Sequence, residues 1–208
     1  MSNTQSSFGF KHVGFLPGYA PDYQLSTRLI ASSNTTSIYF GDPVAKVGST
    51  QYIAQASSTT APLEGIFQGC FLIPSTGGAP TFSPYYPGAA GADVTAYVIA
   101  SPGALFMAAA LNTNIPISYI GLNIGFAIGT GSTIGGAFSG ATLDQTTAST
   151  TNTLPFQVVG LFGSTNTTGS INTGNFGGVG NGSDTTSAYN WVIVSFNNER
   201  YKQLQGVT

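Results

Sequence analysis

Acid–base chemistry in this chain would have to come from carboxylates that stand alone in the sequence. A glycosidase needs two carboxylates on either side of a sugar, so only folding could bring such a pair together. Two of them, Asp42 and Asp144, have the surroundings of turn residues, where a short carboxylate accepts backbone N–H bonds. The seven are Asp22, Asp42, Glu64, Asp93, Asp144, Asp184 and Glu199.

Nucleophilic and metal chemistry have even fewer candidates. His12 is the single imidazole; it follows Lys11 and has no Gly-flanked serine nearby of the kind found at a nucleophile elbow. Cys70 is the single cysteine and stands among apolar residues, which predicts a small buried side chain. One Cys and one His cannot form a structural zinc site. We therefore expect no enzyme activity, no cofactor and no bound metal.

A glycine-rich run, GTGSTIGG at Gly129–Gly136, superficially resembles a phosphate-binding loop. It lacks the GxGxxG spacing and a lysine for a nucleotide, and no convincing helix follows it. This run predicts a glycine-rich hairpin or loop.

The composition excludes further classes of function. The 208 residues include 5 Lys+Arg and 7 Asp+Glu, so 6% are charged, against about 25% in ordinary soluble domains. A nucleic-acid partner is not expected, because binding to phosphates needs clustered Lys and Arg. The 14 Phe, 10 Tyr and mean hydropathy of +0.16 supply enough apolar surface for folding.

No targeting or membrane segment is expected. The start of the chain has no basic region followed by an apolar stretch, so we predict no secretory signal and residence in the compartment that makes the protein. The longest apolar stretch, Ile115–Gly129, is too short for a bilayer and contains Pro116 and Asn123. A membrane partner is therefore not expected.

Short apolar runs separated by Gly, Pro, Asn, Ser and Thr predict an all-β chain. Residues 102–111 fit either one helix or a buried strand. Long Gly/Ser/Thr/Asn-rich surface loops are expected between Gly129 and Asn190, around Thr142–Thr153 and Thr165–Thr186. The expected strands are Ser37–Phe40, Thr50–Ala56, Gly65–Ile73, Val94–Ala100, Tyr119–Ile128, Phe156–Phe162 and Asn190–Phe196.

Several expected strands are apolar on both faces. In the last one, Trp191 and Ile193 face one way while Val192, Val194 and Phe196 face the other. Both faces must be covered. This favours a barrel or sandwich whose outer face packs against a neighbouring subunit, and hence an oligomer.

A family resemblance extends over most of the chain, from about Phe8 to Tyr201. Its pieces keep a common order and spacing: FGFKHVG at residues 8–14, IYFGDPV at 38–44, GIFQGC at 65–70, GLNI at 121–124, LPFQVVGL at 154–161 and VIVSFN at 192–197. Together they resemble the head decoration (cement) proteins of tailed bacteriophages, a group related to the β-tulip capsid-stabilising proteins.

The resemblance implies a short-stranded, β-tulip-like barrel or sandwich and a structural role in the virion. Such a protein is made in the host cytoplasm, binds the major capsid protein on the outer surface of the phage head, usually as a homotrimer, and resists the pressure of packaged DNA. We expect an N-terminal arm at residues 1–20 and a single all-β domain at 21–208.

The predicted arm supplies the candidate contacts with the capsid. It mixes apolar and polar residues and ends at Pro17-Gly18, as expected for a segment that adds a strand to a capsid-protein sheet. The alternative is a tail-associated receptor-binding adhesin whose exposed Tyr and Asn bind host glycans, although fibre proteins usually contain repeats or a coiled coil. The candidate contact residues are Phe8, Phe10, Lys11, His12, Val13, Phe15 and Leu16.

Overall fold

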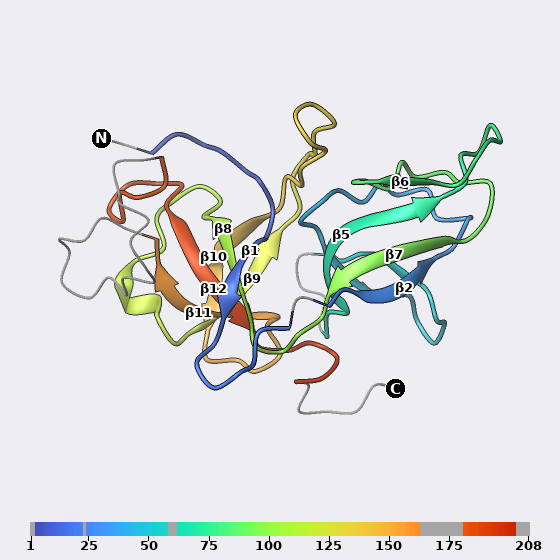
Figure 1. Cartoon of the computed structure of the whole chain (residues 1–208). Coiled ribbons are helices and arrows are strands. Elements are labelled where there is room, and N and C mark those ends of the chain that lie inside the picture. Colours follow the sequence, from blue (N-terminus) through green and yellow to red (C-terminus); the bar gives the residue numbers. More distant parts are fainter. Residues whose placement is uncertain (1–2, 23, 58–61, 163–180, 203–208) are drawn as a thin grey trace.

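The computed structural model describes residues 3–22, 24–57, 62–162 and 181–202, and within them the chain is all-β (Figure 1). Two antiparallel six-stranded sheets lie side by side, and a 3-10 turn, η1 (Ile117–Tyr119), follows β8 in the chain. Sheet 1 has the order β1 (Lys11–Phe15), β8 (Ala104–Ala109), β12 (Trp191–Phe196), β11 (Phe156–Leu161), β9 (Asn123–Ala127) and β10 (Thr142–Ser149). Sheet 2 has the order β2 (Ser26–Ile30), β7 (Val94–Ile99), β5 (Gly65–Leu72), β3 (Pro43–Lys46) and β4 (Ile53–Gln55), and β6 (Thr81–Ser83) pairs with β5.

Each sheet curls toward closure. In sheet 1, the Leu111 N–H donates to the Leu143 carbonyl at 2.9 Å, which brings β10 back to the end of β8. In sheet 2, a bridge between Leu29 and Tyr52 joins β2 to the start of β4. The two curled sheets form two lobes, each with an apolar interior.

The interior of sheet 1 is built on stacked aromatic rings. Phe10 stacks on Phe156 with 4.4 Å between ring centroids, and Phe156 lies 5.8 Å from Phe196. Phe106 meets Phe196 edge-on at 5.0 Å. All four rings are buried, so their apolar area and ring contacts together stabilise this lobe.

The interior of sheet 2 contains the single cysteine and a buried tyrosine. Cys70 is fully buried, and burial raises the pKa of its thiol to about 12. The Tyr86 hydroxyl donates to the Asn34 carbonyl at 2.7 Å, which satisfies its polar group inside the apolar core. The prediction that Cys70 is a small buried side chain is confirmed.

Most predicted strands are present, with shifted ends. Residues 102–111, whose sequence fits either a helix or a buried strand, contain β8. Ser37–Phe40 is not a continuous strand, because Ile38 and Phe40 each form only an isolated bridge. Residues 119–122 precede β9, since the chain first makes η1. The strands confirmed with new bounds are β4, β5, β7, β9, β11 and β12.

The long loop expected around Thr142–Thr153 is wrong for most of its length, because Thr142–Ser149 forms β10. β-branched threonine suits a pleated strand even where the sequence is polar. Residues 165–180 of the second expected loop lie outside the described residues. Four further strands, β1, β2, β3 and β6, were not predicted.

The last strand does not need a neighbouring subunit to cover it. In β12 the residues from Val192 to Phe196 are all buried within the chain, and Ile193 is only 2% exposed. The fold itself covers both faces of this strand.

A buried carboxylate joins the two lobes. The Ser139 hydroxyl, from the β9–β10 connection of sheet 1, donates to Oδ1 of Asp42 at 2.5 Å. The Gln55 amide and the Tyr39 N–H donate to Oδ2, each at 2.8 Å. Burial raises the pKa of Asp42, and these three hydrogen bonds oppose that rise. Asp42 directly precedes β3, so it holds sheet 2 against a loop of sheet 1.

Replacing this hydroxyl should weaken the whole fold. We expect Ser139→Ala to lower the free energy of unfolding by about 1–3 kcal/mol, because a buried acceptor loses a charge-assisted hydrogen bond. Thr133→Ala, an exposed substitution in the same loop, should change it by less than about 0.5 kcal/mol. Urea unfolding followed by tryptophan fluorescence measures both, and equal effects of the two substitutions would contradict the proposed role of Ser139.

Candidate functional site

The predicted N-terminal arm is docked on its own chain over its described part. β1 pairs with β8 in the register Lys11 to Met107 and Phe15 to Ala104. Beyond β1, the Leu16 N–H donates to the Gly103 carbonyl at 2.8 Å. The segment is therefore a strand of sheet 1, because β8 offers it an unpaired edge.

Several of the candidate contact residues face inward. Phe10 is fully buried in the aromatic interior of sheet 1, so a partner cannot reach it. Phe8 packs edge-on against Trp191, with centroids 5.1 Å apart. These two phenylalanines stabilise the lobe.

His12 also belongs to the packing of β1. Its ring lies 4.9 Å from that of Phe15 and 5.9 Å from that of Phe106. Desolvation lowers the pKa of His12, and a hydrogen bond with the backbone of Gly14 opposes that shift. At neutral pH the imidazole is therefore neutral and packs as an aromatic group.

Lys11 and Val13 remain open to a partner. Lys11 is exposed, and Val13 is 37% exposed, while Leu16 is half-buried. Within the part of the chain that the structure describes, no second strand pairs with the other edge of β1. That edge could still accept a strand from another protein.

A stronger candidate surface lies on sheet 2. Phe71 of β5 and Phe82 of β6 are directly opposite in register and are 45% and 57% exposed. Ile73, two residues after Phe71, is 38% exposed. We call these two exposed phenylalanines and the neighbouring isoleucine, Phe71, Phe82 and Ile73, the aromatic patch. Exposed apolar clusters of this kind mark interaction surfaces.

The aromatic patch depends on Gly69. This residue has φ +128°, and a Cβ there would lie 2.6 Å from the Phe82 ring. The register of β5 against β7 shifts at this point, between Phe67 and Gly69. Because only glycine leaves this space free, the ring of Phe82 can approach the backbone of β5 at Gly69.

The sequence held one signal for the aromatic patch. Alternation in β5 sends Cys70 and Leu72 inward, so Phe71 and Ile73 must point outward. The contribution of Phe82 was missed because no strand was expected there.

The glycine-rich run forms a loop, as predicted. The Ser132 N–H donates to the Phe138 carbonyl at 2.9 Å, which gives a hairpin-like projection between the lobes (Figure 1). Ile134 at its tip is 86% exposed. This isolated apolar side chain is a second, smaller candidate contact.

The two residues predicted as turn carboxylates do accept backbone N–H bonds. Asp42 accepts the bond from Tyr39 described above, and Asp144 accepts one from the Thr146 N–H at 3.0 Å. Asp144, however, lies within β10, at an irregularity of its pairing with β9.

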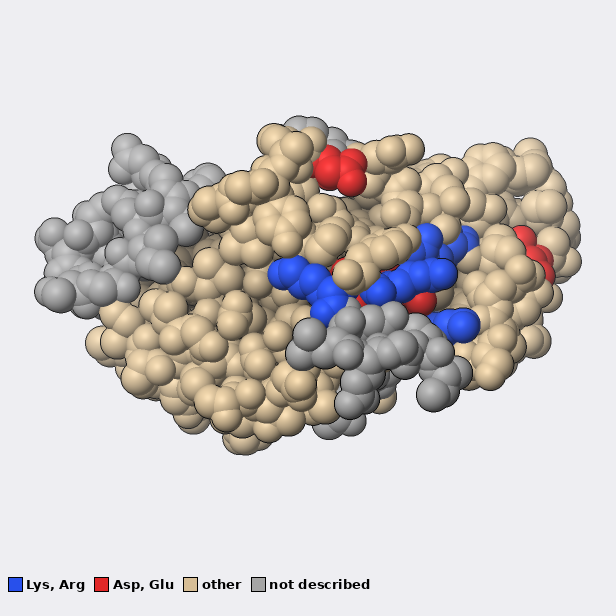
Figure 2. Space-filling view, turned by 90° about the horizontal axis from the view of Figure 1, so that it is seen from below, with Lys and Arg blue, Asp and Glu red and all other residues tan. Residues whose placement is uncertain are grey.

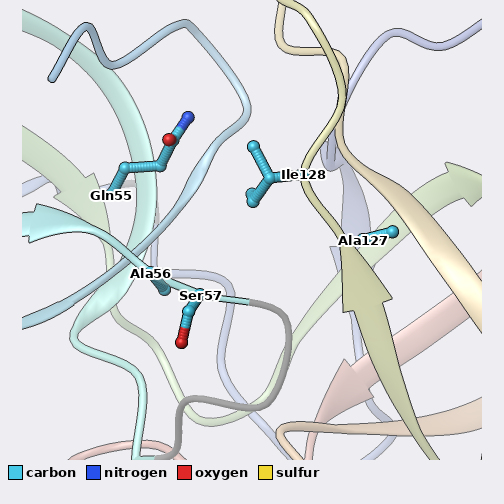
Figure 3. Close-up of a pocket in the computed structure, with 5 residues that line it drawn as sticks. All are labelled: Gln55, Ala56, Ser57, Ala127 and Ile128. Carbon is cyan, nitrogen blue, oxygen red and sulfur yellow. The ribbon is translucent and has the colours of Figure 1, made fainter.

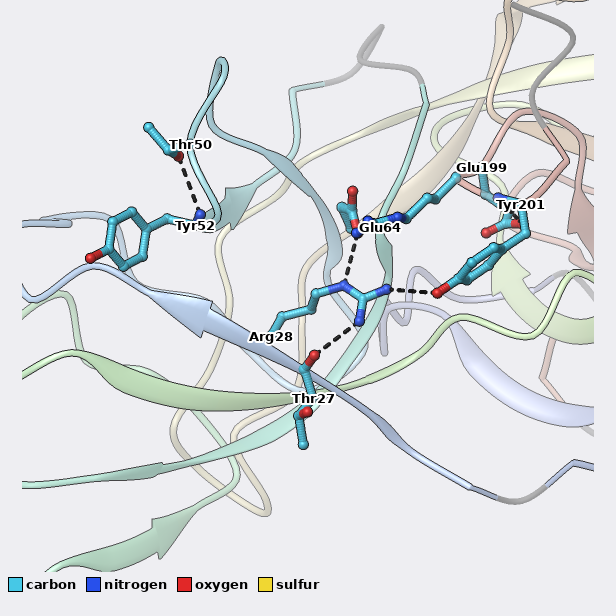
Figure 4. Close-up of polar contacts among 8 residues, drawn as sticks. Thr27, Arg28, Thr50, Tyr52, Glu64, Glu199 and Tyr201 are labelled. Atoms are coloured by element: carbon cyan, nitrogen blue, oxygen red, sulfur yellow. Dashed lines mark hydrogen bonds and ion pairs between the residues drawn. The ribbon is translucent and has the colours of Figure 1, made fainter. Parts of the chain in front are cut away.

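Folding does bring two carboxylates together, Glu64 and Glu199. Oε2 of Glu64 accepts a hydrogen bond from Arg28 Nε at 2.8 Å (Figure 4). The same oxygen accepts one from Arg200 Nη1 at 3.0 Å. Glu199 is fully buried, bridges to Leu63 and accepts from the Tyr201 N–H at 2.8 Å. A sugar cannot reach Glu199, so this pair differs from the open carboxylates of a glycosidase.

The burial of Glu199 also changes its titration. Burial raises its pKa to about 7, and the charge of Glu64 contributes in the same direction. The N–H groups of Tyr201 and Lys202 and the charge of Lys202 oppose the rise. Glu199 therefore binds a proton near neutral pH.

A hollow of about 460 Å³ lies between the lobes (Figure 3). Gln55, Ala56 and Ser57 line it from sheet 2, and Ala127 and Ile128 line it from sheet 1. None of these five side chains is ionisable, so they supply no group for acid–base chemistry.

The described ranges contain no group of three or more His, Cys, Asp or Glu side chains that could hold a metal ion. No helix in the same ranges is long and apolar enough to span a membrane.

Comparison with known proteins gives no relative: no family model, curated protein or solved structure matches this chain. The function must therefore be inferred from the residues and their geometry.

Neutralising Glu199 should change how stability depends on pH. The folded pKa of Glu199, about 7, exceeds the ordinary value of 4.5, so between these values the folded state holds a proton that the unfolded state has released. The stability that this proton contributes is therefore lost as pH rises from about 4.5 to 7. We expect Glu199→Gln to remove about 1–3 kcal/mol of that loss. Urea unfolding at several pH values measures it.

The exposed Asp22→Asn substitution is the control and should leave the pH profile unchanged. Parallel profiles for wild type and Glu199→Gln would show that Glu199 does not titrate in this range.

Proposed function

We propose that this chain is a structural virion protein that decorates the outer surface of a phage capsid and stabilises the shell. The observation that carries the proposal is the aromatic patch, together with the ordered sequence pieces that resemble decoration proteins. Its proposed partners are the major capsid protein and, in a homotrimer, further copies of itself. It would be made in the host cytoplasm and function on the virion.

The chemistry of the aromatic patch suits a protein partner. The centres of protein–protein interfaces are enriched in aromatic residues and depleted of charge. No Lys or Arg occurs between Lys46 and Arg200, so β5, β6 and β7 carry no cation. A partner surface can cover these strands without burying an unpaired lysine or arginine.

The edge of β1 provides a second contact in this proposal. Val13 and Lys11 are the exposed members of the predicted set, and they lie on sheet 1. The aromatic patch lies on sheet 2. A protein that contacts the shell through both lobes can bridge neighbouring capsid subunits, as a clamp must.

The test is co-sedimentation of the purified protein with expanded capsids that lack it. Wild type should bind in near-stoichiometric amounts to the capsid protein and raise the temperature at which the shells break. Phe82→Asp should weaken binding at least tenfold, because a charge would be buried at the centre of the contact. Point substitutions are preferable to deleting the arm, since Phe10 belongs to the core.

Ile117→Asp is the matched control, because Ile117 is 43% exposed and lies on η1 of the other lobe. It should bind like wild type. Val13→Asp reports on β1 separately. If Phe82→Asp binds normally and Val13→Asp loses binding, the contact with the capsid lies on β1 and not on the aromatic patch. If folded wild type does not bind capsids at all, the adhesin alternative is favoured, and a glycan array is the next experiment.

A further inference from the structure

The few cations of this chain gather around one hollow. Arg28, Lys46 and Arg200, three of the five lysines and arginines, line a cavity of about 340 Å³. Figure 2 shows Lys and Arg side chains concentrated in the middle of one face, with acidic atoms among them. In a chain with so few charges, this concentration calls for an explanation.

Segments distant in the sequence build the hollow. Arg28 comes from β2, Lys46 ends β3, and Arg200 follows β12. The turn between β3 and β4 adds the polar residues Ser49, Thr50 and Gln51 to the lining. The cavity lies at the small end of the range for ligand sites, which suits a small group rather than a polymer.

Glu64 balances only part of the positive charge. Its Oε2 accepts from both Arg28 and Arg200, so one carboxylate serves two guanidinium groups. With three cations and one carboxylate, the lining carries a formal charge of +2, although the whole chain carries −2. The local excess of positive charge favours an anion in the hollow.

Donors remain free after the internal contacts are made. The side chain of Lys46 has no hydrogen bond or ion pair to any of the described residues. Arg200 uses Nη1 for Glu64, which leaves most of its five N–H donors unused within the same ranges. Arg28 is held in place by Glu64, Thr27 and Tyr201 (Figure 4). The hollow therefore offers a fixed guanidinium beside two cations with open donors.

We propose that this hollow binds one oxyanion, a carboxylate or phosphate group of a small ligand, through Lys46 and Arg200. Charge-assisted N–H···O bonds from these side chains would satisfy the free donors. Glu64 holds Arg28 and Arg200 in position but is not itself a ligand. The inference is independent of the capsid proposal, because the aromatic patch and this hollow share no residue.

Titration of the full chain with inorganic phosphate and with glucuronate, followed by two-dimensional NMR, tests the site. At constant ionic strength set with sodium chloride, saturable shifts are expected for the amides of Ser49, Thr50 and Gln51. Lys46→Gln should weaken the fitted affinity about fivefold, as for loss of one exposed charge partner. The exposed side chain of Lys46 has no polar partner among the described residues, so this variant should fold normally.

Lys11→Gln is the matched control, since Lys11 is an exposed lysine on β1 of the other sheet, and it should bind like wild type. Shifts with phosphate alone identify a phosphate ligand, shifts with glucuronate alone a carboxylate ligand, and shifts with both a general oxyanion site. Shifts that do not saturate, or that match those in chloride or in Lys46→Gln, would overturn the proposal.

Discussion

Two buried carboxylates and one backbone bridge hold the two lobes together, and the rest of the structure depends on these contacts. Asp42 accepts a hydrogen bond from Ser139 of sheet 1, and Glu64 accepts one from Arg200 in the segment after β12. The backbone around Glu199 pairs with Leu63, ahead of β5. Removing one partner from such a contact leaves an uncompensated polar group in the interior, which costs more than the contact itself contributes. The chain has few charged residues, and several of them lie at this junction between the two lobes.

The position of the charged residues determines which parts of the outer surface are uncharged. Because most cations lie near Glu64, strands β5 to β7 are left without lysine or arginine. Their outer face can then present Phe71 and Phe82, an arrangement that suits burial against another protein. The molecule thus separates a neutral apolar surface from one small cationic hollow, and each suits a different kind of partner.

The sequence predicted elements where the apolar alternation is strong and local. Val94–Ala100 alternates clearly and Asn190–Phe196 is an apolar run with both faces buried, and both are strands within a residue or two of the expected bounds. Thr142–Ser149 resembles a loop because its threonines are polar, and only its pairing with β9 makes it a strand. The aromatic patch depends on long-range register at Gly69, which no local pattern contains.

The cationic hollow could not be predicted for the same reason, since Lys46 and Arg200 lie at opposite ends of a long stretch of the chain without lysine or arginine. Because Lys46 and Arg200 both line the hollow, the hollow lies at the junction between the two lobes. Lys46 belongs to sheet 2, while Arg200 follows the last strand of sheet 1 and donates its N–H to Leu63 at 2.9 Å. An oxyanion held by both side chains would connect the two lobes beside Glu64. Any ligand that binds only this folded arrangement must stabilise it by RT ln(1 + L/Kd), where L is the free ligand concentration, so the free energy of unfolding rises with the logarithm of ligand concentration above Kd.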